Sequence, residues 1–437
     1  MFKNIFFLYY FNYQKIKYYL FFTILCAATY GGALFYFPFN PDDLIILSSI
    51  VNESSPLNFF WKDWGLNNNP LYRPLHSITV WFSYIIFDWS FWSFNQFVNI
   101  FLHVVIMSLL FNLLKGFQTD KTFLFISICA FLITPITILP VTWISNRHTL
   151  FVAIFLISLL KYFTYSKSRF LDNRIVYLLI LLSLLSQESG LILPIFVFLY
   201  TILIENRFHN KIKIIWNMVF IILGYMIFRF FIFGPNFVQY SESGFLFGYI
   251  KYNSLTDFEH PLRYYGYIEN IFKNFIASFL PLFNNDGGLF IYNVNGDIKN
   301  ILNICLNIII ITITLIILFK SKIMHTSKLR KIAMIIIFIN AILHFSISNH
   351  RILYIPQICL CLFISSAQFN PKDMPLIKFL AISMLLINVF KMQHSINRSA
   401  LYRHNQINIY NLQDLQKNIH RINPNLIHQI NIRYKYK

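Results

Sequence analysis

Apolar runs of about 20 residues recur along the whole of this 437-residue chain, and a helix of that length spans the ~30 Å hydrocarbon core of a bilayer. Hydrophobic residues make up 57% of the chain and charged residues 12%. A water-soluble domain of this size does not have such a composition. The runs therefore predict an all-α, polytopic membrane protein.

About 11 membrane spans are expected, within a range of roughly 10 to 13. The turn "SQESG" separates two of them and predicts a tight connection between helices. The expected spans are residues 18–38, 97–114, 122–140, 149–165, 175–187, 190–204, 214–233, 300–319, 332–348, 352–369 and 376–392.

The formal charge of +19 arises mainly from Lys and Arg between alternate spans. Cationic loops stay in the cytoplasm, which places the N-terminus inside and most acidic residues outside. This explanation makes nucleic-acid binding unnecessary. The five cysteines lie in apolar runs and form no CxxC pair, so the spacing indicates neither a zinc site nor a disulfide framework.

We expect a membrane domain over 1–392 with two long extracytoplasmic regions, 39–96 and 234–298, followed by a short basic tail at 393–437. The first region contains the apolar piece "LHSITVWFSYIIFDW", which is short for a span and suits an interfacial helix. The second contains the amphipathic segment 264–283, expected at the outer interface with Glu269 and Lys273 on its wet side.

Acidic and cationic residues on the expected outer face are the candidates for chemistry. Asp42 and Asp43 follow the first span, and Tyr72 and Arg73 lie later in the same loop. An Asp after Pro also starts helices, and an interfacial Arg also contacts phospholipid headgroups. A carboxylate beside a guanidinium would equally suit a general base next to a phosphate-binding group.

Three further outer junctions carry polar residues that could equally be hydrated turns or an interfacial belt. Arg229 is the exception, because it lies inside an apolar run near the outer end. The junction candidates are Asn146, Arg147 and His148 in "PVTWISNRHTL", Gln187 and Glu188 in "LLSQESGLILP", and His350, Arg351 and Tyr354 in "SNHRILYIPQ".

With these residues in order, the chain resembles the GT-C superfamily of integral-membrane glycosyltransferases. The likeness is to the branch of protein O-mannosyltransferases bearing tetratricopeptide repeats and their bacterial relatives. "NPDDL", "NPLYRPLHS", "WISNRHTL", "SQESGLILP" and "HRILYIPQ" resemble that branch's motifs, and Asn99 and His103 occupy expected places in "FNQFVNIFLHVV". Two departures stand out: Gln187 replaces the usual Lys, and the repeat domain is missing.

The resemblance implies a GT-C-like helix bundle, a polyprenyl-phosphate-linked sugar donor, and transfer on the extracytoplasmic side. Asp42 matches the family's catalytic carboxylate. A lipid phosphate is a stable leaving group, so one base, one anion clamp and good positioning are enough, with inversion at the anomeric carbon. Arg73 is the expected clamp, with Arg147 or Arg351 as alternates. No cofactor is required, and a divalent cation at Asp42 and Asp43 is the alternative.

The expected partners are the lipid-linked donor, membrane lipids and a glycan, lipid or protein hydroxyl acceptor. We expect a bacterial inner membrane with the site facing the periplasm, or the endoplasmic reticulum lumen in a eukaryote. Two other functions stay open. An O-antigen-type polymerase or ligase would also use outer arginines, and a lipid-linked sugar flippase or transporter would place ionisable residues at mid-membrane.

Overall fold

The computed structural model describes residues 13–35, 50, 53–61, 72–87, 91–118, 120–165, 174–204, 208–233, 263–279, 298–321, 328–344 and 353–410. Every regular element in these ranges is a helix, and none of the described residues forms a strand. The all-α class predicted from the apolar runs is therefore confirmed for this part of the chain.

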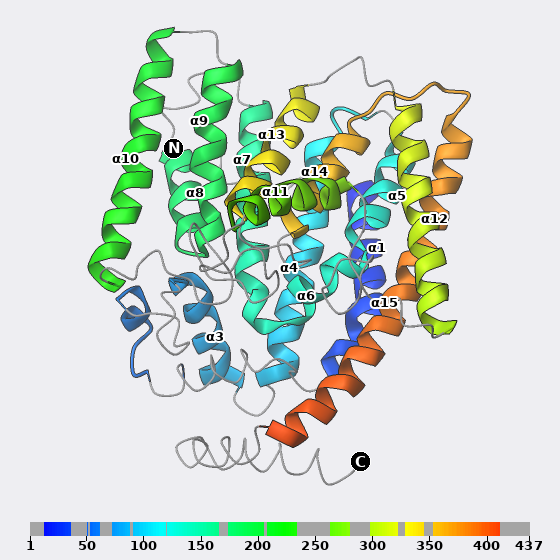
Figure 1. Ribbon diagram of the computed structural model, residues 1–437, viewed down its shortest axis with the longest axis horizontal. Helices are drawn as coiled ribbons and strands as arrows, with labels where there is room; N and C mark the ends of the chain where they lie inside the picture. The colour runs from blue at the N-terminus through cyan, green and yellow to red at the C-terminus, as the bar shows by residue number, and fades with distance from the viewer. Residues whose placement is uncertain are drawn as a thin grey trace.

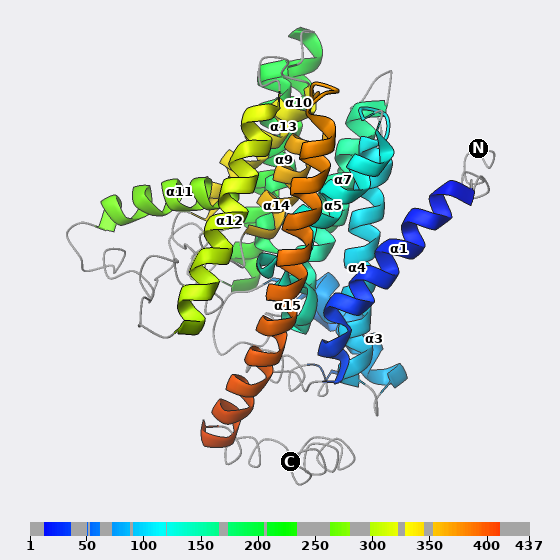
Figure 2. The ribbon, with the colours of Figure 1, turned by 90° about the vertical axis from the view of Figure 1, so that its right-hand side faces the viewer.

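Long helices stand side by side in a single bundle (Figures 1 and 2). They are α1 (Tyr13–Tyr30), α4 (Phe91–Leu114), α5 (Lys121–Leu132), α7 (Arg147–Tyr165), α8 (Arg174–Leu184), α9 (Ile192–Ile204), α10 (Phe208–Phe233), α12 (Ile298–Lys320), α13 (Lys328–Leu343), α14 (Tyr354–Ser365) and α15 (Met374–Tyr410). The five-residue α6 (Ile138–Thr142) belongs to the bent segment after α5.

Shorter helices join or cross the bundle. Most lie near its lower end in Figure 1, whereas α11 crosses the long helices. They are η2 (Gly31–Phe35), η3 (Pro56–Phe60), α3 (Pro74–Phe87), η5 (Pro135–Thr137), η6 (Ile144–Asn146), η7 (Glu188–Leu191) and α11 (Arg263–Phe279).

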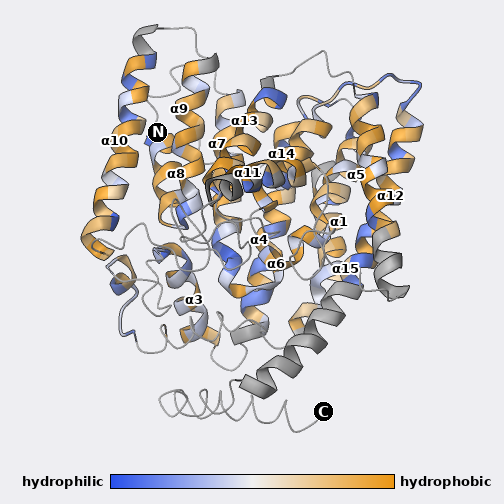
Figure 3. Cartoon of the chain, in the orientation of Figure 1, coloured by the Kyte–Doolittle hydropathy of each residue, from blue (hydrophilic) through white to orange (hydrophobic). Residues whose placement is uncertain are grey.

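The apolar core is centred on α14, which packs against α5, α7 and α13. Nearly every side chain of α14 is buried, which explains its uniformly apolar sequence. Apolar residues also cover the outward faces of the long helices (Figure 3). Phe220 on α10 and Phe319 on α12, for example, are 64% and 79% exposed. Apolar residues both inside and outside are typical of helices in lipid.

Fewer helices meet the requirements of a membrane span than the sequence predicted. Within the described residues, four helices are long and apolar enough: Ser93–Leu114, Ile144–Tyr165, Lys211–Phe233 and Met374–Gln393. A fifth counts if α5 and the bent segment after it form one span. The expected number of about 11 is therefore not supported. Each of the other predicted spans also contains a helix. One of these helices, α8, has 11 residues and is only about 16 Å long.

Local sequence explains where α5 begins and where its path bends. The side chain of Asp120 caps the helix by accepting a hydrogen bond from Phe123 N–H (2.9 Å). At the other end, the segment Pro135–Thr142 leaves the direction of α5 by 61°. Pro135 cannot donate a backbone hydrogen bond to continue the helix, so the chain turns there.

Ion pairs mark one end of the bundle, which we call the basic end. Lys320 contacts Asp373 (3.2 Å) and Lys378 contacts Asp120 (2.5 Å) across helix junctions. The opposite end holds the turn between α8 and α9 and the start of α3. There the Leu75 N–H donates to the Leu185 carbonyl (3.1 Å).

Two helices have ends that differ from those predicted from the sequence. The interfacial piece in the first loop is indeed a helix, α3, but α4 already begins at Phe91 rather than near residue 97. The expected polar tail is helical as far as Tyr410, because α15 continues past residue 393. No Gly or Pro interrupts residues 376–410, so nothing in the local sequence ends the helix earlier.

Candidate functional site

Nine of the candidate residues lie in the described chain, and the other four lie outside it. The two carboxylates Asp42 and Asp43, together with His350 and Arg351, fall outside the described residues. Their assignments remain predictions. The described candidates are Tyr72, Arg73, His103, Asn146, Arg147, His148, Gln187, Glu188 and Tyr354.

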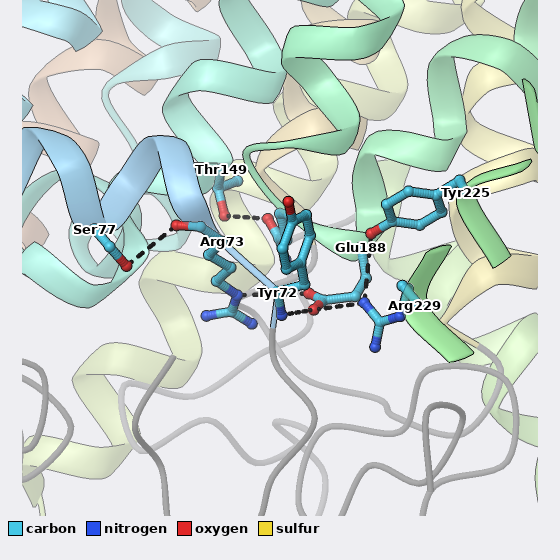
Figure 4. A network of polar contacts seen from close by, with 8 residues as sticks. Tyr72, Arg73, Ser77, Thr149, Glu188, Tyr225 and Arg229 are labelled. Carbon is cyan, nitrogen blue, oxygen red and sulfur yellow. Dashed lines mark hydrogen bonds and ion pairs between the residues drawn. The ribbon is translucent and has the colours of Figure 1, made fainter. Parts of the chain in front are cut away.

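Glu188 is the centre of a buried polar cluster (Figure 4). Its Oε1 accepts hydrogen bonds from the Tyr72 backbone N–H (2.9 Å) and from the Arg229 guanidinium (3.0 Å). Its Oε2 lies 3.5 Å from Arg73 Nε. Arg229 also contacts the Tyr225 hydroxyl (3.4 Å). We call Tyr72, Arg73, Glu188, Tyr225 and Arg229 the Glu188 cluster.

Three separate segments bring the Glu188 cluster together. Arg73 immediately precedes α3, which is fixed to the end of α8 by the Leu75–Leu185 hydrogen bond. Glu188 begins η7, directly after the turn that follows α8. Arg229 lies on α10, close to its C-terminal end. The turn is tight because Gly190 approaches the Ser183 carbonyl so closely that a side chain there would overlap it.

Burial and nearby charges have opposite effects on the pKa of Glu188, which is 3% exposed. Burial alone would raise the pKa of this carboxyl, but Arg73, Arg229 and the Tyr72 N–H hold the pKa below its ordinary value. Glu188 is therefore ionised. Counting described side chains only, the cluster contains two guanidinium groups and one carboxylate. Burial also raises the pKa of the neighbouring Tyr72 phenol, which stays protonated and donates to the Phe60 carbonyl (3.2 Å).

Arg147 occupies a second buried polar site. Its Nε donates to Asn99 Oδ1 (2.7 Å), one terminal nitrogen donates to Asn95 Oδ1 (2.6 Å), and the other donates to Thr79 (3.3 Å). Arg147 is fully buried. These bonds hold α7 against α3 and α4, and the role of Arg147 as an alternate phosphate clamp stays a prediction.

His148 lies near a histidine that the sequence analysis did not select. The ring of His76 is 5.8 Å from the ring of His148, and both side chains are buried. His76 Nε2 lies 2.9 Å from the Ile144 carbonyl. Burial, aided by the nearby Arg147 charge, lowers the pKa of His76 to about 3. His76 is therefore neutral near pH 7 and donates its Nε2–H to that carbonyl.

His103 and Tyr354 meet inside the bundle. His103 Nδ1 lies 2.7 Å from the Tyr354 hydroxyl, and both side chains are buried. The Tyr30 ring packs edge-on against His103 (5.5 Å), and its hydroxyl contacts Thr137 (2.6 Å). These contacts link the pair to α1 and η5.

The remaining two candidates lie at helix junctions. Gln187 precedes η7, and its side-chain oxygen accepts from the Thr149 hydroxyl (3.3 Å), so it joins α7 to the turn that holds Glu188. Asn146 ends η6 and is only partly buried.

Sequence reasoning selected Arg73 and Glu188 but did not select Arg229 as a site residue. Its position within an apolar run was the available signal, because an intramembrane arginine needs an anionic partner. Asn95, Thr79 and His76 were also missed. The spacing of polar residues in their helices does not distinguish a buried hydrogen-bond partner from a residue on the surface. Within the described residues, no three His, Cys, Asp or Glu side chains converge in a way that could hold a metal ion.

No family model, curated protein or solved structure matches this chain. The described residues form an all-helical bundle in which several helices are suited to crossing a membrane. A buried arginine–glutamate cluster lies at one end of this bundle.

Proposed function

We propose that this protein is an integral-membrane glycosyltransferase. It transfers a sugar from a polyprenyl-phosphate donor to an acceptor hydroxyl on the extracytoplasmic face of the membrane. The acceptor belongs to a glycan, a lipid or a protein. The observation that supports this most directly is the convergence of Arg73, Glu188 and Arg229 at the end of the bundle opposite the basic end.

The Glu188 cluster has the chemistry of an anion site. A guanidinium presents a planar fork of N–H donors that matches two phosphate oxygens. Glu188 fixes the orientation of two such groups, since it contacts Arg73 and Arg229 through different oxygens. In a buried setting, charges act on a bound phosphate more strongly than they would in water. The cluster therefore supports the recognition of a lipid phosphate.

In the proposed reaction, Asp42 removes the proton from the acceptor hydroxyl. The acceptor oxygen then bonds to the anomeric carbon as the bond from that carbon to the phosphate oxygen breaks. Polyprenyl phosphate leaves with the electron pair, and the arginines stabilise its charge. A phosphate needs no general acid to depart, in contrast to the sugar alkoxide released in glycoside hydrolysis. A direct displacement inverts the anomeric carbon.

Asp43 has a supporting role in this mechanism. Two adjacent carboxylates titrate as a pair, so Asp43 raises the proton affinity of Asp42 when both are close. A divalent cation held by the two aspartates is the alternative arrangement. The reaction itself requires no cofactor.

The substitution Asp42→Asn tests the proposal in membranes supplied with a radiolabelled polyprenyl-phosphate sugar. We expect transfer to fall by about 10²- to 10⁴-fold, the usual contribution of a general base. Asp43→Asn should have a smaller effect. Asp373→Asn is the matched control, because that carboxylate lies at the basic end and pairs with Lys320. Undiminished transfer by the Asp42 variant would remove it from the chemistry, and absence of transfer by the wild type would refute the function.

A further inference from the structure

The helix α11 crosses the long helices and projects from the side of the bundle (Figures 1 and 2). It packs against α13 and α14. Its direction differs from that of the long helices. The distribution of its polar and apolar side chains indicates which environment each face contacts.

The face of α11 that packs on the bundle carries polar residues beside the small Ala277. Asn270, Asn274 and Ser278 are each at most 2% exposed. The Asn274 amide donates to the His344 carbonyl next to α13 (2.9 Å), and the Ser278 hydroxyl donates to the Asn274 carbonyl (2.7 Å). The spacing of these residues, four apart, puts them on one stripe of the helix.

The opposite face of α11 is apolar and exposed. Ile268, Phe272 and Ile276 are 54%, 63% and 46% exposed. They also follow a spacing of four residues and form a continuous ridge, which we call the α11 ridge. A helix on a water-soluble surface has the reverse arrangement, with apolar residues inside and polar residues outside. Small and polar residues at the helix contact, with apolar residues outside, are typical of helices packed within lipid.

We propose that the α11 ridge contacts lipid acyl chains, so that α11 lies in the membrane beside the bundle. The helix that α11 packs on, α13, also exposes apolar residues, since Phe338 and Ile342 are 51% and 42% exposed. The chemistry of both surfaces fits hydrocarbon and offers nothing to water or to a charged partner.

Spin-label accessibility tests this contact in the whole protein reconstituted in phospholipid vesicles. The starting variant is Cys305→Ser, because Cys305 is exposed and the other four cysteines are buried. A nitroxide is attached at Phe272→Cys, and its collisions with oxygen and with a water-soluble nickel chelate are measured. Phe390→Cys is the lipid reference, since Phe390 lies on the span of α15 and is 61% exposed. Asn370→Cys, in the exposed polar turn before α15, is the water reference.

We expect the label at position 272 to collide with oxygen in preference to nickel, as at position 390 and opposite to position 370. Ile268→Cys and Ile276→Cys should give the same preference, which guards against a local disturbance at one site. Nickel access at position 272 equal to that at position 370 would show that the ridge faces water. Low access to both reagents would show that a protein surface covers it, and either result would overturn the proposal.

Discussion

Glu188 shows how a single buried charge depends on its partners. Arg73 and Arg229 approach its two carboxylate oxygens, and the Tyr72 N–H completes the set. Removing one member of a buried ion pair leaves the other uncompensated, which costs far more than the pair contributes in net stability. The same residues provide both the stability of this end of the bundle and the positioning of the proposed anion site.

The substitution Glu188→Gln should destabilise the protein by about 3–5 kcal/mol, because two guanidinium groups then face each other without a carboxylate. The melting temperature in detergent measures the effect. Asp373→Asn is the control, since it removes a more exposed carboxylate from a surface pair worth about 0–1 kcal/mol. Equal melting temperatures for the Glu188 variant and the wild type would contradict the buried cluster.

The pH dependence of stability should also show the contribution of the ionised Glu188 carboxylate. The pKa of Glu188 is lower in the folded protein than the ordinary 4.5 of the unfolded chain. Its contribution is therefore complete above pH 4.5 and is lost as the pH falls through the folded pKa. The Glu188→Gln variant lacks this acid-dependent component, so its melting temperature should change less than that of the wild type below pH 4.5.

At the residue scale, sequence reasoning found the polar residues at the helix junctions but could not pair them. Glu188 and Arg73 are 115 positions apart along the chain, and Arg229 follows 41 positions after Glu188. Contacts at such separations depend on how α3, η7 and α10 pack. The sequence also did not indicate that Asn95 and Asn99 are the hydrogen-bond partners of Arg147.

At the scale of secondary structure, the junction of α8, η7 and α9 is the element on which the Glu188 cluster depends. The sequence predicted a tight turn at "SQESG", and the structure confirms it. The turn brings Gly190 against the backbone of α8, where the Ser183 hydroxyl also donates to the Gly190 carbonyl (3.1 Å). Only a residue without a Cβ fits this approach.

The substitution Gly190→Ala tests the turn. A Cβ at this position would lie 2.1 Å from the Ser183 carbonyl oxygen, so backbone must move, at a cost of about 1–3 kcal/mol or more. Gly224→Ala on α10 is the matched control, because a Cβ there would have no neighbour within 4 Å. We expect a larger loss in melting temperature for position 190. A loss that is equal or smaller would mean that the turn adapts easily.

The apolar pattern predicted where helices occur more reliably than where they end. The amphipathic segment expected over 264–283 is the helix α11, and the apolar piece of the first loop is α3. The ends differ because capping and local breaks decide them. Asp120 begins α5 through a side-chain hydrogen bond, whereas α15 continues beyond the end of its apolar run at about residue 392.

At the scale of the whole molecule, the two ends of the bundle carry different ion pairs. The basic end holds Lys320 and Lys378 with their acidic partners, and the opposite end holds the Glu188 cluster. The proposed function requires that the basic end face the cytoplasm, in keeping with the retention of cationic loops on that side.

Cysteine labelling of intact cells tests this orientation in the Cys305→Ser background. A membrane-impermeant maleimide should label Leu57→Cys, a 66%-exposed position in η3, without permeabilisation. Asn370→Cys, at the basic end, should react only after permeabilisation. The reverse pattern would put the Glu188 cluster in the cytoplasm and would refute transfer on the extracytoplasmic face, while leaving the lipid contact of α11 untouched.

The sequence by itself determined the helical class, the membrane environment and the approximate positions of the helices. The length and periodicity of apolar segments are local properties of the sequence, and they decide whether a helix is stable in water or in lipid. The tertiary structure alone decided the pairing of Glu188 with two distant arginines and the outward apolar face of α11. These features arise from packing between segments far apart in the chain, and no local pattern encodes such contacts.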